Sequence, residues 1–160
     1  MPVIRVCQRC SAKNRVPGSH LADVGYCGAC KTMLAPQQEP VEVDTETFDE
    51  IIKTARVPVL VDFWAEWCRP CMMSAPAVAR LAVEMAGDTL VIKVDTERYP
   101  ELANRYFVRG IPHFMVFVGG RPVEQHTGMA SFEQLQEWIQ GAKEKAAERL
   151  RQLRDQKRVG

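Results

Sequence analysis

The most informative stretch of the chain is residues 57–71, VPVLVDFWAEWCRPC. Within it, residues 58–65 form an almost continuous run of apolar and β-branched side chains, which is typical of a strand buried on both faces. A CxxC pair, Cys68 and Cys71, follows directly, and residues 69–86 then show the apolar spacing of a helix. Cys68 is therefore expected where a buried strand gives way to a helix.

The position of Cys68 favours a reactive thiol. Backbone N–H groups at the start of a helix, together with the helix dipole, stabilise a thiolate. Arg69 adds a nearby positive charge, and Pro70 occupies the first turn, where its missing N–H costs nothing. Cys71, one turn later, can attack a mixed disulfide formed at Cys68. These residues predict a redox-active dithiol and disulfide.

A zinc knuckle is the main alternative for this pair, because CxxC is also the spacing of metal ligands. Two observations argue against it. The other four cysteines already make a complete ligand set, and the bulky Trp67 precedes the pair on a buried strand.

Strand and helix patterns alternate on either side of this stretch. We expect strands at 41–43, 58–65, 90–96, 113–118 and 122–127, and helices at 48–55, 69–86, 99–107 and 131–155. Thr45 or Thr47 is expected to cap the first helix, and Ser131 with Gln134 predicts a capping box for the last. Short crossovers predict parallel central strands, and the turn at Gly119–Gly120 adds an antiparallel hairpin at one side. The result is an α/β fold with its functional site beyond the carboxyl ends of the parallel strands, where Cys68 falls.

The first 30 residues contain two further CxxC pairs, with sixteen residues between Cys10 and Cys27. This is the spacing of a tetrathiolate zinc site, with Cys7, Cys10, Cys27 and Cys30 as ligands. Four protein ligands leave no open position, so one Zn²⁺ would be structural, and its binding would supply folding energy where there is no room for a core. Disulfides or free thiols are the alternative, and ligand oxidation would make the site redox-sensitive.

Charge divides the chain into three segments, although the net charge is only +1. Residues 1–40 carry five Lys/Arg against two acids, 41–140 carry nine against fifteen, and 141–160 carry seven against three. We predict a zinc-binding module with a linker at 1–40, an acidic α/β domain at 41–140, and a basic helical extension at 141–160. The extension is expected to be a solvated helix; contact with nucleic acid or an acidic partner is the alternative.

Neither a signal peptide nor a membrane span is visible in the sequence. We therefore expect a cytoplasmic protein with no membrane association. Thiols are kept reduced in that compartment, so six cysteines there point to metal binding or redox catalysis, not to structural disulfides.

Several motifs together resemble the thioredoxin family in order and spacing. They are VLVDFWAEWCRPC, Pro76, VIKVDTE, RGIPHFMVF with Gly119–Gly120, and HTG, and they extend over residues 41–140. The resemblance implies a thioredoxin fold, a central mixed sheet flanked by helices, here preceded by a small zinc-ribbon-like module. That combination is similar to the zinc-containing second thioredoxin of bacteria.

The resemblance also implies roles for two charged residues. Asp62 matches the buried carboxylate that assists proton removal from Cys71, and Lys93 matches its neighbouring lysine. Burial in an apolar strand should raise the pKa of Asp62, which makes it a plausible base near neutrality. The alternative is a carboxylate that is merely paired with Lys93.

A substrate groove is implied in the same way. Trp64 and Trp67 match residues that shape the active-site surface. Pro112 matches a cis-proline facing the dithiol, Ile111 offers backbone hydrogen bonds to an extended substrate, and Gly128 leaves room for the groove. The predicted substrate-binding residues are Trp67, Arg69, Pro70, Ile111, Pro112 and Gly128.

Two positions depart from the family pattern. Arg69–Pro70 stands where Gly-Pro is usual, and a positive charge beside the thiolate should stabilise the reduced form and make the disulfide more oxidising. His113 stands where threonine is common. It either titrates with the dithiol or is a solvated strand residue.

The sequence thus predicts a protein-disulfide reductase that acts through Cys68 and Cys71. The resemblance implies regeneration by a flavin-containing, NADPH-dependent thioredoxin reductase. The alternative is a zinc-dependent, redox-sensitive binding module, either a chaperone or a nucleic-acid adaptor, although nucleic acid is not the partner we expect.

Overall fold

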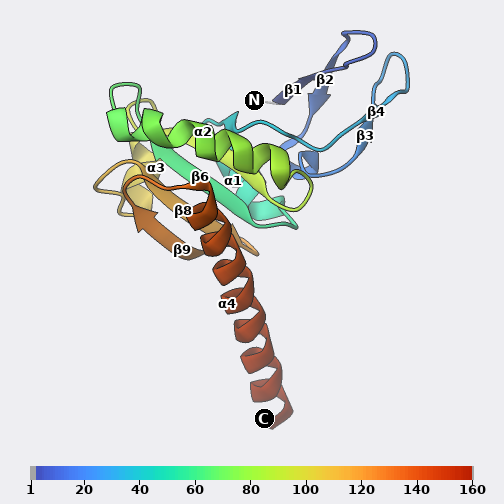
Figure 1. Ribbon diagram of the computed structural model, residues 1–160. Helices are drawn as coiled ribbons and strands as arrows, with labels where there is room; N and C mark the ends of the chain where they lie inside the picture. Colours follow the sequence, from blue (N-terminus) through green and yellow to red (C-terminus); the bar gives the residue numbers. More distant parts are fainter. Residues whose placement is uncertain (1–2, 160) are drawn as a thin grey trace.

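The computed structural model describes residues 3–159. Two small hairpins precede a five-stranded sheet with helices on both faces, and a long helix ends the chain (Figure 1). The hairpin strands are β1 (Val3–Val6), β2 (Lys13–Val16), β3 (Gly25–Tyr26) and β4 (Met33–Leu34), with a short 3-10 helix η1 (Gly18–His20) between the hairpins. The remaining elements are β5 (Val41–Glu42), α1 (Thr45–Thr54), β6 (Val59–Trp64), α2 (Arg69–Glu84), β7 (Leu90–Asp95), α3 (Pro100–Arg105), β8 (His113–Val118), β9 (Arg121–Thr127) and α4 (Phe132–Val159).

The sheet has the strand order β5-β7-β6-β8-β9. β5, β7 and β6 are parallel, whereas β8 is antiparallel to β6 and β9 is antiparallel to β8. The expected parallel centre and antiparallel hairpin are both confirmed. β6 lies in the middle, and its parallel carboxyl end leads to the loop that carries Cys68.

The alternating side chains of β6 explain its continuous apolar sequence. One set faces α1 and α3, and the other faces α2 and α4. The first core contains Val59, Val61, Phe63, Phe48, Ile51, Ile92, Leu102, Met115 and Phe117. The second contains Leu60, Val78, Leu81, Val91, Phe114, Val116, Leu135 and Ile139. Because helices cover both faces, every residue of β6 except the last is buried.

The start of α1 differs from the expectation that Thr45 or Thr47 caps it. Asp44 has extended backbone angles, and its carboxylate accepts a hydrogen bond from the Thr47 amide at 2.8 Å. The helix begins one residue after Asp44, so both threonines lie inside its first turn. By contrast, the capping box of α4 is confirmed. The Ser131 amide donates to Gln134 Oε1 at 3.0 Å, and the Gln134 amide donates to Ser131 Oγ at 3.2 Å.

The segment between the two hairpins, residues 17–24, packs against the sheet domain. Leu21 is completely buried and belongs to the core beneath α1. Gly18 lies so close to α1 that a Cβ there would be 2.9 Å from Ile51 Cγ1. Residues 1–40 therefore contribute to the main core as well as carrying the cysteine pairs.

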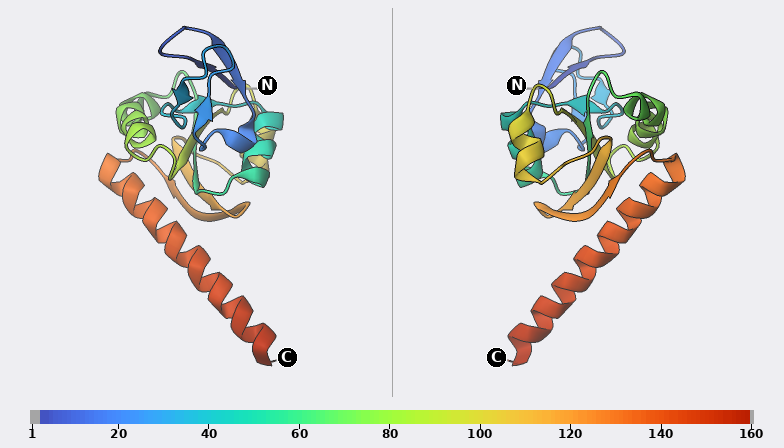
Figure 2. Two further views of the ribbon diagram at one scale, coloured as in Figure 1. Left: turned by 90° about the vertical axis from the view of Figure 1, so that its right-hand side faces the viewer. Right: turned by 90° about the vertical axis from the view of Figure 1, so that its left-hand side faces the viewer.

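The C-terminal part of α4 projects away from the rest of the molecule (Figure 2). Its base is held to β9, where Glu124 contacts both His126 and Lys145. The His126 ring also stacks on Trp138, with 3.9 Å between centroids. Residues 147–159 are helical and exposed throughout. Within residues 3–159, no helix combines the length and apolarity needed to cross a membrane.

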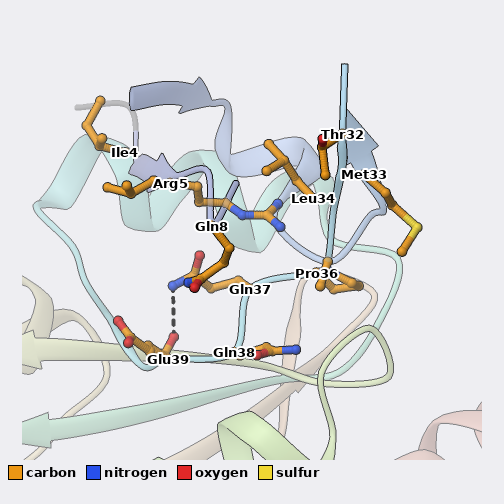
Figure 3. Close-up of a pocket in the computed structure, with 12 residues that line it drawn as sticks. Ile4, Arg5, Gln8, Thr32, Met33, Leu34, Pro36, Gln37, Gln38 and Glu39 are labelled. Carbon is orange, nitrogen blue, oxygen red and sulfur yellow. Dashed lines mark hydrogen bonds between the residues drawn. The ribbon is translucent and has the colours of Figure 1, made fainter. Parts of the chain in front are cut away.

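A hollow of about 440 Å³ lies between the first hairpin and residues 32–39 (Figure 3). Arg5 reaches into it, and burial lowers the pKa of that guanidinium. On its other side, Gln37 Nε2 donates to the Glu39 carbonyl at 3.2 Å. Among the described residues that line this hollow there is no cysteine.

Candidate active site and cysteine cluster

Cys68 and Cys71 are joined by a disulfide at the start of α2, with 5.3 Å between their Cα atoms. Cys68 is the N-cap residue, and its Sγ accepts a hydrogen bond from the Cys71 amide at 3.2 Å. Both cysteines are almost fully buried, in a small cluster with Ala65, Trp64 and Ile111. The structure thus places the two sulfurs within bonding distance, and a backbone N–H points at the sulfur expected to carry the negative charge.

Asp62 lies on β6, the strand that precedes the dithiol, and is 2% exposed. Burial raises its pKa to about 7, and the opposing charge of Lys93 only partly offsets this effect. One carboxyl oxygen, Oδ1, has no hydrogen-bond partner within residues 3–159. Lys93 is paired with Asp62 in the register of β6 and β7, and its Nζ lies 4.1 Å from the centroid of the Trp64 ring. The carboxyl group can therefore gain or lose a proton near neutral pH.

A groove of about 410 Å³ runs beside Cys68. It is lined by Trp67, Cys68, Arg69, Pro70, Thr96, Ala103, Val108, Arg109, Gly110 and Ile111. Trp67 is 69% exposed, and its Nε1 donates to Glu97 Oε1 at 2.9 Å, which fixes the indole at the groove edge. Four predicted substrate-binding residues, Trp67, Arg69, Pro70 and Ile111, thus line one groove with Cys68.

The other two predicted groove residues lie next to each other. The Ile111–Pro112 peptide bond is cis, as the family resemblance implies. The Gly128 amide donates to the Pro112 carbonyl at 2.9 Å. Gly128 has φ +108°, a conformation that side chains with a Cβ rarely adopt, and no atom lies within 4 Å of where a Cβ would be.

His113 is not a solvated strand residue, so that expectation is wrong. It is 7% exposed, and its ring packs against Phe63 with 6.1 Å between centroids. Nδ1 lies 2.8 Å from Thr127 Oγ1, and Nε2 lies 3.1 Å from Gln125 Oε1. Burial lowers the pKa of His113, so the ring is neutral with both nitrogens hydrogen-bonded.

The four N-terminal cysteines lie together, with all their Sγ atoms within 4.8 Å of one another. Cys7 and Cys30 have their sulfurs 3.6 Å apart, and Cys10 and Cys27 have theirs 3.7 Å apart. Four thiolates about 2.3 Å from a tetrahedral zinc ion would be about 3.8 Å from one another. The arrangement therefore fits a tetrathiolate metal site.

The two CxxC pairs have the same backbone structure, each at the tip of a hairpin. The Cys7 amide donates to the carbonyl five residues later at 2.9 Å, and the Cys27 amide does the same at 2.8 Å. The residue after each pair has φ 63°, at Ser11 and Lys31. Amides within each loop thus point toward the sulfurs, and they contribute to lowering the pKa of Cys27 to about 6.

Asn14 is a part of this cluster that the sequence interpretation missed. Its Nδ2 lies 3.5 Å from Cys27 Sγ, and its Oδ1 accepts from the Gly28 amide at 2.9 Å. Asn14, on β2 of the first hairpin, thus contacts the loop that carries Cys27 and Cys30. Thr32 plays a comparable part, with its Oγ1 3.2 Å from Cys30 Sγ. Neither residue has a spacing that distinguishes it from an ordinary loop residue.

Comparison with known proteins places the chain in a family. The thioredoxin family model matches residues 39–141. The chain is 39% identical over 137 residues to thioredoxin C-3 of Corynebacterium nephridii, covering 86% of this chain and 93% of that relative. It is 42% identical over 94 residues to thioredoxin 1 of Chlorobaculum tepidum, covering 59% of this chain and 93% of that one.

Solved structures agree. A mutant thioredoxin from Halobacterium salinarum aligns with a TM-score of 0.63 and 34% identity, over 68% of this chain and 95% of that one. A chloroplastic thioredoxin z structure aligns with a TM-score of 0.61 and 25% identity, over 66% of this chain and 95% of that one. With its buried CxxC disulfide at the start of α2, the chain belongs to the thioredoxin family and is a thiol–disulfide oxidoreductase that reduces protein disulfides.

Proposed function

We propose that Cys68 attacks protein disulfides, that Cys71 resolves the intermediate, and that Asp62 handles the proton of Cys71. The observation that carries this assignment is the N-cap position of Cys68 in α2, with an amide hydrogen bond at its sulfur. An electron-rich sulfur is favoured there, whereas Cys71 lies three residues further on, inside the helix.

The reaction balances in two exchange steps. The Cys68 thiolate attacks one sulfur of the substrate disulfide, which forms a mixed disulfide and releases the other substrate sulfur as a thiolate. Asp62, ionised above its pKa of about 7, takes the proton of Cys71. The Cys71 thiolate then attacks Cys68 Sγ, which releases the second substrate thiolate and leaves Cys68 and Cys71 oxidised. Two electrons pass from the protein to the substrate.

Substrate enters along the groove beside Cys68. This cysteine is only 2% exposed, so a substrate segment must lie closely against Trp67, Pro70 and Ile111 to reach it. The backbone of Ile111 and the space beside Gly128 suit an extended segment. Lys93 limits how far burial raises the pKa of Asp62 and so keeps the carboxyl group able to ionise near neutrality.

We further propose that Cys7, Cys10, Cys27 and Cys30 bind one Zn²⁺ with a structural role, as in the zinc-containing second thioredoxin of bacteria. The sulfur separations of 3.6 and 3.7 Å and the surrounding amides support this ligand set. Bound zinc would hold the two hairpin tips together. Reduced thiolates are required for binding, so oxidation of these ligands would compete with the metal.

Regeneration of the dithiol needs an electron donor, because each turnover leaves Cys68 and Cys71 oxidised. We propose an NADPH-dependent thioredoxin reductase in the cytoplasm as that donor, as the family resemblance implies. Protein disulfides are the other partners.

Matched cysteine-to-serine variants test these assignments together. Cys68→Ser should abolish insulin reduction and retain about one zinc per chain, whereas Cys10→Ser should lose the zinc and keep a functional dithiol. Cys71→Ser should accumulate a mixed disulfide with substrate, visible by non-reducing electrophoresis. Turnover by Cys68→Ser would contradict the proposed nucleophile, and zinc retained by Cys10→Ser at the wild-type level would contradict the ligand set.

The same variants address the alternative of a zinc-dependent binding module. That function would survive Cys68→Ser and disappear with Cys10→Ser. Salt-dependent affinity for nucleic acid would support an adaptor that uses the basic helix.

A further inference from the structure

Two arginines are among the residues that line the groove beside Cys68. Arg69 lies between the two cysteines in sequence, and Arg109 precedes Gly110 and Ile111, which also line the groove. Both side chains are exposed, and neither forms an ion pair with any of residues 3–159. No carboxylate lines the groove. Both positive charges are therefore available to a bound molecule.

Three acidic residues of this part of the chain, Glu66, Asp95 and Glu97, are not among the residues that line the groove. Glu97 accepts a hydrogen bond from the Trp67 indole at 2.9 Å, and Asp95 Oδ1 accepts from the Glu97 amide at 2.9 Å. These neutral donors leave the carboxylates charged, but within residues 3–159 none of the three forms an ion pair with either arginine.

The groove is also opposite in sign to the domain around it. Residues 41–140 carry nine Lys/Arg against fifteen Asp/Glu, yet the charged side chains lining the groove are both arginines. The positive end of α2 points to the same place. An acidic substrate is thus repelled by most of the domain and attracted at the dithiol, which favours its approach in the productive orientation.

Resting on the proposed reductase function, we infer that Arg69 and Arg109 make this enzyme select disulfides whose cysteines have Glu or Asp as near neighbours. A segment that reaches Cys68 enters the groove that Arg69 and Arg109 line, so a side chain one or two residues from the attacked sulfur comes close to these arginines. Arginine binds carboxylates through paired N–H groups, which gives direction as well as attraction. The substrate class is therefore acidic protein disulfides.

Single-turnover rates measure this selection directly. Protein with a reduced dithiol is mixed with symmetric peptide disulfides that carry either Glu or Gln on both sides of the cysteine, and the second-order rate constants are compared. The Glu-to-Gln ratio is the rate constant for the Glu peptide divided by that for the Gln peptide. At low salt this ratio should be about 3- to 10-fold higher in the wild type than in Arg69→Gln/Arg109→Gln. The difference should shrink as salt is added.

Comparing the Glu-to-Gln ratio between protein variants isolates the effect of the groove. The intrinsic reactivity of each peptide is the same for every protein variant, so it does not affect the comparison of ratios between variants. A substitution that changes the thiol pKa or the reduction potential of the protein alters the rate constants of both peptides equally, so it leaves the ratio unchanged. Arg56→Gln removes the same charge at an exposed site outside the groove and should keep the wild-type ratio. Arg69→Glu should shift the preference toward a Lys-flanked peptide.

A wild-type ratio no higher than that of the double variant would overturn the inference, as would an equal loss in Arg56→Gln. Neither result would touch the proposed function, which the reduction of both peptides would still support. Failure of reduced wild-type protein to react with any peptide disulfide would instead refute the function itself.

Discussion

Replacing Asp62 with asparagine should raise the stability of the protein relative to wild type by an amount that grows as the pH rises. The same substitution should slow the reaction. Asp62 is 2% exposed, and burial raises its pKa from an ordinary 3.8 to about 7. Between these two values the folded protein keeps the carboxyl proton, whereas the unfolded chain releases it. The folded state therefore binds more protons, and its stability falls as pH increases.

The size of the effect follows from the two pKa values. One pKa unit corresponds to about 1.4 kcal/mol, so the shift from 3.8 to about 7 amounts to about 4 kcal/mol. This contribution is fully present below pH 4 and is lost as the pH passes through about 7. The amide introduced by Asp62→Asn cannot ionise, so the advantage of this variant over the wild type should grow by about 4 kcal/mol between pH 4 and pH 8.

Urea unfolding of the oxidised proteins at a series of pH values measures this difference. Effects of the substitution that do not depend on pH, such as the hydrogen bonding of a buried amide, change the free energy of unfolding equally at every pH. They therefore leave the slope of stability against pH unchanged. Asp155→Asn makes the same chemical change at an exposed position and should track the wild type. A difference between Asp62→Asn and wild type that stays flat from pH 4 to pH 8 would refute the assignment of a raised pKa. In the same variant, resolution of mixed disulfides near pH 7 should be slower than in wild type.

Three other substitutions or treatments have definite expected outcomes. Lys93→Gln removes the charge that lowers the pKa of Asp62, so the carboxyl group should titrate above about 7, as infrared difference spectra of its C=O stretch will show. Leu21→Ala should lower the free energy of unfolding of the whole protein by about 2–5 kcal/mol, measured with urea, because this side chain is fully buried beneath α1. A loss of stability confined to the hairpins would contradict this expectation. A strong zinc chelator should lower the melting temperature of the wild type and leave Cys10→Ser unaffected, which differential scanning calorimetry can establish.

The sheet domain could be predicted from the sequence because its signals are local. Residues 58–65 show the apolar run of a doubly covered strand, and β6 occupies Val59–Trp64. The capping box at Ser131 involves residues three apart, and it is present. Apolar periodicity and short-range caps are fixed within a few residues, so they can be recognised without knowing the tertiary structure.

One incorrect expectation involves contacts that the local sequence does not contain. His113 packs against Phe63, and its two ring nitrogens bond to Gln125 and Thr127 on the neighbouring strand. The other concerns a local contact: Asp44 caps α1 by accepting from the Thr47 amide three residues later, so the error was one of choosing among adjacent capping residues.

The two cysteine sites show the same division. The CxxC spacings predicted both sets of sulfurs, and those sulfurs are brought together in the structure. The residues that hold them came from elsewhere in the chain: Asn14 binds beside Cys27, and Glu97 fixes Trp67 across thirty residues. Such partners belong to the packing of elements rather than to a motif.

The projecting part of α4 also separates charge in space. Residues 147–159 extend about 20 Å at 1.5 Å per residue, and all are exposed. Residues 141–160 carry seven Lys/Arg against three acids, whereas the sheet domain has an excess of acids. The projecting helix and the sheet domain therefore carry charge of opposite sign. A negatively charged surface attracts the helix and repels the domain, and added electrolyte weakens both effects.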